Sequence, residues 1–81
     1  MMYKYKINDS NILYTFESEY GKKYGPELAE YAAYDYYVTN DNKNDKWPVI
    51  IHLYLYEEYK YIGSYKVYLE IEPTFFAEKI K

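Results

Sequence analysis

Hydrophobic and polar residues alternate along two segments near the start of the chain. In the first segment Tyr3, Tyr5 and Ile7 lie on one side, and the residues between them, both lysines, lie on the other. Alternation with a period of two is typical of a β-strand with one buried face. Residues 8–11 are turn formers, and the alternation then resumes over residues 12–17. We therefore predict a β-hairpin in this part of the chain.

A helix is predicted from Pro26 to Val38. Proline suits the first helical position because its missing N–H would have no partner there. At about 100° per residue, the small and apolar side chains fall on one stripe, which comprises Leu28, Ala29, Ala32, Ala33 and Tyr36. The outer face of the helix would carry Glu27, Glu30, Tyr34 and Tyr37. This mixture of carboxylates and phenols makes the outer face a candidate contact surface.

The strongest pattern in the chain is the apolar run that follows Trp47-Pro48. Alternate residues of this run face opposite ways, with Val49, Ile51, Leu53 and Leu55 on one side and Ile50, His52, Tyr54 and Tyr56 on the other. Residues 57–60 indicate a turn. The returning strand would place Tyr61, Gly63, Tyr65, Val67, Leu69 and Ile71 on one side and Ile62, Ser64, Lys66, Tyr68, Glu70 and Glu72 on the other. Pro73 ends or bends this strand.

The order of these elements predicts a single α+β domain that covers residues 1–81. We expect an antiparallel sheet of four to five strands with one helix packed on one face, in the order β-β-α-β-β. The C-terminal element, residues 74–80, is compatible with either a last short strand or a helical turn. The expected core comprises Val49, Ile51, Leu53, Leu55, Val67, Leu69 and Ile71 against Leu28, Ala32 and Tyr36.

The composition favours contact surfaces over chemistry. The 81 residues include fifteen tyrosines and one histidine but no cysteine and no arginine. Codon bias of an A+T-rich gene would explain part of the tyrosine excess, yet so small a domain cannot bury fifteen phenols, so many must lie at the surface. The missing cysteines exclude a disulfide framework and thiol catalysis. No signal peptide or membrane-spanning run is recognisable, and we expect a cytoplasmic protein.

Neither a catalytic site nor a metal or cofactor site is predicted. His52 has no predictable acid beside it, the serines lack a nucleophile motif, and the glycines form no phosphate-binding loop. The Asp and Asn residues of segment 40–46 lack the glycine and the distal glutamate of a calcium loop. The net charge of −3 argues against non-specific binding of nucleic acid, and no membrane partner is expected. We therefore expect a non-enzymatic protein.

Two candidate binding surfaces follow from the predicted fold. One helix cannot cover both faces of a sheet, so the far face would expose an aromatic strip. The partner-binding candidates on this strip are Tyr54, Tyr56 and Tyr68 with His52 and Lys66, and those on the helix are Glu30, Tyr34 and Tyr37. Two other occupants of the far face stay open, namely the N-terminal hairpin and a second copy of the chain in a homodimer. A third alternative is single-stranded nucleic acid, stacked on tyrosines and contacted by lysines.

Several short motifs between Leu28 and Ile80 resemble a group of small proteins from bacteria and their phages. The group shares an alanine-rich acidic helix, a Trp-Pro before a hydrophobic strand, a glycine-containing strand and a Glu-Pro-x-Phe end. In this chain the corresponding motifs are Glu30-Tyr31-Ala32-Ala33, Trp47-Pro48-Val49-Ile50, Ile62-Gly63-Ser64-Tyr65 and Glu72-Pro73-Thr74-Phe75. Tyrosines here replace residues that are more often charged in the group.

The same features resemble phage-encoded inhibitors of host defence complexes, a class that includes the anti-CRISPR proteins. Inhibitors of this class commonly occupy a site on their target in a fixed stoichiometry. The resemblance therefore implies a protein partner in the host cytoplasm, and a defence protein that handles nucleic acid is one candidate for it. Tyrosine anchors with a rim of carboxylates would suit the basic channel of such a partner.

Overall fold

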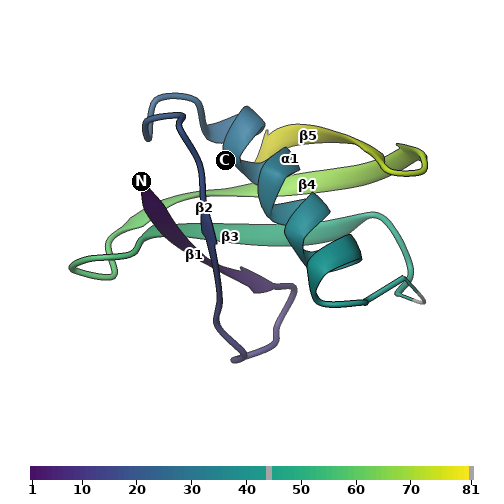
Figure 1. The fold of residues 1–81 in the computed structure, drawn as a ribbon, viewed down its shortest axis with the longest axis horizontal. Coiled ribbons are helices and arrows are strands. Elements are labelled where there is room, and N and C mark those ends of the chain that lie inside the picture. Colours follow the sequence, from purple (N-terminus) through teal and green to yellow (C-terminus); the bar gives the residue numbers. More distant parts are fainter. Residues whose placement is uncertain (44, 81) are drawn as a thin grey trace.

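The computed structural model describes residues 1–43 and 45–80 (Figure 1). Its helices and strands are β1 (Met2–Ile7), β2 (Tyr14–Glu17), α1 (Gly25–Tyr34), the π-helical turn η1 (Asp35–Thr39), β3 (Val49–Leu55), β4 (Tyr61–Ile71) and β5 (Thr74–Ile80). The α+β class with an antiparallel sheet is confirmed. The segment that the sequence left open, residues 74–80, is a strand.

The five strands form one sheet in the order β2-β1-β3-β4-β5, and every neighbouring pair is antiparallel. Helix α1 crosses one face of this sheet (Figure 1) and contacts β3, β4 and β5. The N-terminal hairpin pairs with β3 through β1, so it extends the sheet sideways and does not cover the face opposite α1.

The core lies between α1 and the sheet, and it is unusually rich in tyrosine. Five phenols are buried, those of Tyr3, Tyr5, Tyr36, Tyr37 and Tyr65. A buried phenol must have a partner for its hydroxyl group. Tyr3 donates to the carbonyl of Tyr20 at 2.6 Å, and Tyr5 donates to Oδ2 of Asp35 at 2.6 Å. These two bonds allow β1 to bury phenol rings. Aliphatic side chains at the same positions would need no hydrogen-bond partner.

The helix lies close to the sheet because its inner stripe is small. Leu28, Ala29, Ala32 and Ala33 are all fully buried. At the start of the helix, Gly25 lies directly against the hydroxyl of Tyr65 on β4. The helix therefore reaches the sheet through contacts that leave no room for larger side chains.

The end of the helix differs from the prediction and changes which residues are buried. The backbone N–H of Asn40 donates to the carbonyl of Asp35 at 3.0 Å, the i→i+5 bond of a π-helical turn. This wider turn rotates less per residue than an α-helix, so Tyr36 and Tyr37 both point toward the core. Tyr37 is 3% exposed and packs against the rings of Trp47 and Phe75. Its predicted place on the outer face is wrong.

Another prediction fails at the end of the second hairpin. Ile71 was expected in the core but is 75% exposed. The pairing of β4 with β5 shifts register between Leu69 and Ile71, immediately before the tight turn at residues 72–73. The shift removes Ile71 from the alternation that faces α1. Leu55 and Leu69, also expected in the core, are partly buried and pack against it.

The contact between Gly25 and Tyr65 generates a stability prediction. A Cβ at position 25 would overlap the Tyr65 hydroxyl, so Gly25→Ala should lower the free energy of unfolding by about 1 to 3 kcal/mol. Gly21→Ala is the matched control, because a Cβ there meets nothing within 4 Å. Adding Tyr65→Phe to Gly25→Ala should recover part of the loss in urea denaturation. Equal effects of the two alanine substitutions would contradict this packing.

The buried phenols also predict how stability depends on pH. Burial raises the pKa of Tyr3, Tyr5, Tyr36 and Tyr65, and contact with the Glu72 carboxylate raises that of Tyr37. Above about pH 10 the unfolded chain ionises these groups while the folded chain keeps them protonated, so the free energy of unfolding falls as pH rises.

The measurement is an ultraviolet titration of tyrosinate in the folded protein and in urea, together with urea midpoints above and below pH ~10. The five buried tyrosines, out of fifteen, should ionise at a higher pH in the folded protein than in urea. Ordinary titration of all fifteen in the folded protein would disprove the burial of these rings.

Candidate protein-binding surfaces

The sheet face opposite α1 carries aromatic and basic side chains. Residues of β1, β3 and β4 that alternate with the core residues must point to this side. We call this surface the open sheet face. With the residues of β2 and β5 that pair beside them, it comprises Lys4, Lys6, Thr15, Glu17, Ile50, His52, Tyr54, Tyr61, Ser64, Lys66, Tyr68, Phe76, Glu78 and Ile80. Four of the five partner-binding candidates from the sequence, all except Tyr56, therefore lie on one face. Tyr56 follows the end of β3 and adjoins this face through Lys4.

Lysines and tyrosines form a compact cluster at one end of the open sheet face. The amine of Lys4 lies 4.9 Å from the ring centroid of Tyr56 and 5.3 Å from that of Tyr59. The amine of Lys6 lies 5.8 Å from the ring of Tyr54 and 5.6 Å from that of Tyr59. A hydrogen bond with Tyr59 also raises the pKa of Lys6. Cation–π contacts of this kind hold the rings and the charges in place before any partner arrives.

A β-bulge adds a further tyrosine to this cluster. The pairing of β3 with β4 shifts between Leu53 and Tyr54, so Tyr61 pairs with Tyr54 and their ring centroids are 5.6 Å apart. Tyr61 is 56% exposed, whereas Ile62 packs against the core. The sequence pattern had assigned these two residues to the opposite faces, because simple alternation cannot include an extra residue in one strand.

A chain of hydrogen bonds fixes His52 on the open sheet face. The Nδ1 atom of His52 lies 2.6 Å from Oγ of Ser64, and Nε2 lies 3.1 Å from the carbonyl oxygen of Asn8. A carbonyl can only accept, so in the neutral ring Nε2–H donates to Asn8 and Nδ1 accepts from Ser64. The hydroxyl of Tyr61, 2.6 Å from the Ser64 oxygen, then donates to it. Both ring nitrogens of His52 are thus engaged within the protein, and the imidazole offers mainly its ring surface to a partner.

A second aromatic group lies at the other end of the face. The amine of Lys66 is 5.6 Å from the ring of Tyr68, whose centroid is 6.3 Å from that of Phe76 on β5. Lys66 and Phe76 are exposed, and Tyr68 is half-buried. Sequence reasoning missed Phe76, Lys4 and Lys6 as neighbours of the candidate tyrosines, because no local pattern tells which strands lie side by side.

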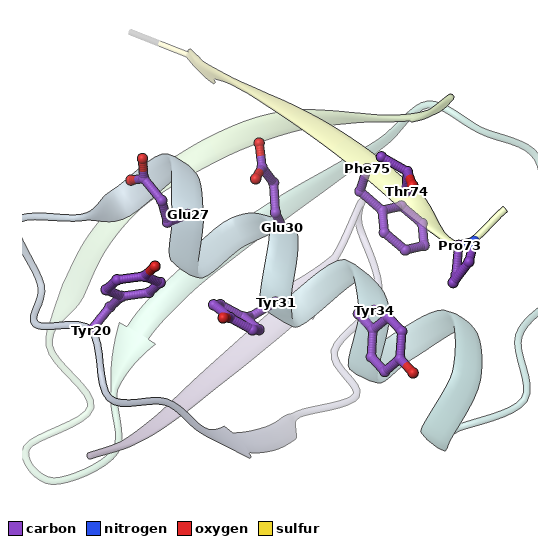
Figure 2. Close-up of a pocket in the computed structure, with 8 residues that line it drawn as sticks. All are labelled: Tyr20, Glu27, Glu30, Tyr31, Tyr34, Pro73, Thr74 and Phe75. Atoms are coloured by element: carbon purple, nitrogen blue, oxygen red, sulfur yellow. The ribbon is translucent and has the colours of Figure 1, made fainter. Parts of the chain in front are cut away.

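The other candidate surface is a groove along the outer side of α1 (Figure 2). Its volume is about 430 Å³, and we call it the helix groove. Its lining residues are Tyr20, Glu27, Glu30, Tyr31, Tyr34, Pro73, Thr74 and Phe75. Two of the three helix candidates from the sequence, Glu30 and Tyr34, line it together. The third, Tyr37, is buried and takes no part.

Glu30 links this groove to the edge of the sheet. Its Oε2 atom accepts a hydrogen bond from the backbone N–H of Ala77 on β5 at 3.1 Å. Burial raises the pKa of the Glu30 carboxyl, and the charges of Glu27 and Glu70 raise it further, although the Ala77 N–H lowers it. The carboxylate is therefore held in one position in surroundings that favour a compensating positive charge.

The two surfaces differ in electrostatic character. The open sheet face carries Lys4, Lys6 and Lys66 together with Glu17 and Glu78, whereas the residues that line the helix groove include Glu27 and Glu30 and no lysine. Within residues 1–43 and 45–80, no three histidine or acidic side chains converge to hold a metal ion. In the same residues, no helix is both long and apolar enough to cross a membrane.

A comparison with protein-family models, with curated proteins and with solved structures found no match to this chain.

The hydrogen-bond chain on the open sheet face predicts the tautomer of His52. The ring nitrogens should show the Nε2–H form in ¹⁵N NMR spectra at a pH where an ordinary histidine, with a pKa of about 6.5, is neutral. Ser64→Ala removes the donor to Nδ1 and should let the other tautomer become populated. Tyr61→Phe is the control, since it keeps the bond between Ser64 and His52. A dominant Nδ1–H form in the unaltered protein would refute this arrangement.

Proposed function

We propose that this chain is a non-enzymatic protein-binding module that uses the open sheet face. The observation that carries this proposal is the cluster of ordered but accessible tyrosines on that face. Tyr54 and Tyr68 are both half-buried. Exposed rings lie beside each of them, those of Tyr59 and Tyr61 beside Tyr54 and that of Phe76 beside Tyr68. Half-buried aromatic anchors with exposed aromatic neighbours are the usual composition of the energetically important part of an interface.

The pre-ordering of these rings favours tight association. Each tyrosine has only two side-chain torsions to fix, and ring contacts already restrict them in the free protein. Tyr54 lies 4.7 Å from Tyr59 and 5.6 Å from Tyr61 between ring centroids. A partner therefore gains contact area with a small loss of conformational entropy.

The partner class we propose is a host protein that handles nucleic acid, blocked by occupation of one of its sites. The resemblance to phage-encoded inhibitors supports this class, and occupation of a site needs no catalytic group. His52 and Ser64 do form a hydrogen-bonded pair, but we assign them the role of positioning Tyr61 on the open sheet face.

A second candidate function is the binding of single-stranded nucleic acid by the same face. The observation that favours it is the position of Lys4, Lys6 and Lys66 beside the stacked tyrosines. Stacking on aromatic rings with lysine contacts to phosphate is a common mode of single-strand recognition. The overall charge of −3 and the missing arginine favour the protein partner instead.

The double substitution Tyr54→Ala/Tyr68→Ala tests the protein-binding proposal. Partners captured from a host lysate by the unaltered chain should be lost, and affinity for a purified partner should fall at least about 30-fold, as expected for two interface anchors. Tyr24→Ala, an exposed tyrosine beside the start of α1, is the matched control. Urea denaturation must show that both variants remain folded.

Three results would overturn the proposal. Unchanged capture by the folded double variant would place the binding surface elsewhere. Micromolar, salt-sensitive binding of short labelled single strands would favour the nucleic-acid function. Sedimentation as a dimer that dissociates on Tyr54→Ala/Tyr68→Ala would show that a second copy of the chain occupies the face.

A further inference from the structure

The helix groove has a negative charge that none of its own lining residues balances. Glu27 and Glu30 both line it, and its eight lining residues include no lysine. The chain contains no arginine anywhere. A guanidinium group that fills this groove must therefore come from another molecule.

Aromatic rings also line the groove. Tyr20 and Tyr31 have ring centroids 5.6 Å apart with planes tilted by 47°, and Tyr34 and Phe75 lie at the other end. In Figure 2, Glu30 points from α1 toward β5, while the rings of Tyr31 and Tyr34 lie on the other side of the helix. The faces of such rings attract cations, and most strongly cations that are themselves planar.

The Glu30 carboxylate is held in a fixed orientation and can still accept further hydrogen bonds. The bond from the Ala77 N–H occupies one lone pair of Oε2 and fixes the orientation of the group. An ionised carboxylate offers about four lone-pair sites, so acceptor positions remain available in the groove. Its partial burial means that an incoming cation stabilises a charge that solvent only partly compensates.

We propose that the helix groove binds an arginine side chain presented by a protein partner. A guanidinium group can donate two parallel hydrogen bonds to the Glu30 carboxylate, which an ammonium group cannot do, and its planar face can stack on Phe75, which lies on the same β5 side of the helix (Figure 2). A volume of about 430 Å³ accommodates this group with its aliphatic stem. The proposal is independent of the open sheet face, because the groove lies on the other side of the sheet.

The test is a titration of the ¹⁵N-labelled full chain with a capped Gly-Arg-Gly peptide, followed by NMR. Saturable shifts are expected at the amides of Glu30, Tyr31, Tyr34, Thr74 and Phe75, with a dissociation constant of about 1 mM or below. The same peptide with citrulline, a neutral isostere of arginine, should bind at least about 10-fold more weakly. A lysine peptide should be intermediate.

Variants then localise the binding. Glu27→Gln/Glu30→Gln should weaken the arginine peptide at least about 10-fold, and glutamine at position 30 keeps an acceptor for the Ala77 N–H. The matched control is Glu57→Gln/Glu58→Gln, which removes the same charge in the turn between β3 and β4 and should leave binding unchanged. Tyr54→Ala/Tyr68→Ala should also leave it unchanged, which separates this inference from the proposed function.

The inference is overturned by any of three outcomes. The first is the absence of saturable shifts in the groove of the unaltered chain. The second is equal affinity for the arginine peptide and either the citrulline or the lysine peptide, which needs no variant to measure. The third is an equal loss of binding in the two glutamate-to-glutamine double variants, which would indicate attraction to overall charge only.

Discussion

The burial of two tyrosines on β1 is the constraint on which the rest of the structure depends. Tyr3 and Tyr5 lie fully inside the core, and their hydroxyls bond to Tyr20 and Asp35. These bonds connect β1 to the segment before α1, which contains Tyr20, and to the π-helical turn η1 after α1, which begins at Asp35. Because side chains alternate along a strand, the same burial places Lys4 and Lys6 on the open sheet face. The burial of Tyr3 and Tyr5 thus organises the core and also places two lysine charges on the exposed surface.

The placement of β1 in the sheet separates two surfaces of different chemistry. Strand β1 lies between β2 and β3, so the N-terminal hairpin widens the sheet and leaves the tyrosines of β3 and β4 accessible. Its lysines join those tyrosines, while the carboxylates of α1 lie on the other side beside β5. An overall acidic chain therefore presents a sheet face with a cluster of lysines and tyrosines, and on the other side an acidic aromatic groove. Net charge alone conceals this division, since it sums over both sides of the molecule.

Three errors of sequence reasoning occur where a single residue alters the local period. The π-helical turn at Asp35–Thr39 brings Tyr37 into the core. The bulge after Leu53 exchanges the faces of Tyr61 and Ile62, and a shift after Leu69 exposes Ile71. Periodicity assumes a constant rotation per residue, so one wider turn or one extra residue changes the faces of the residues next to it. Such irregularities explain why Tyr37, a predicted surface residue, is buried, and why Tyr61, predicted on the core side, lies on the open sheet face.

The sequence by itself determined the α+β class, the helix, the two hairpins and the aromatic character of one strand face. These features follow from the spacing of neighbouring residues along the chain, which depends on local geometry only. The tertiary structure alone decided that β1 lies beside β3, that His52 meets Ser64, and that Glu30 reaches the edge of β5. Each of these contacts joins residues far apart in the chain. Their pairing is selected by how well whole surfaces pack together, and no local pattern records that selection.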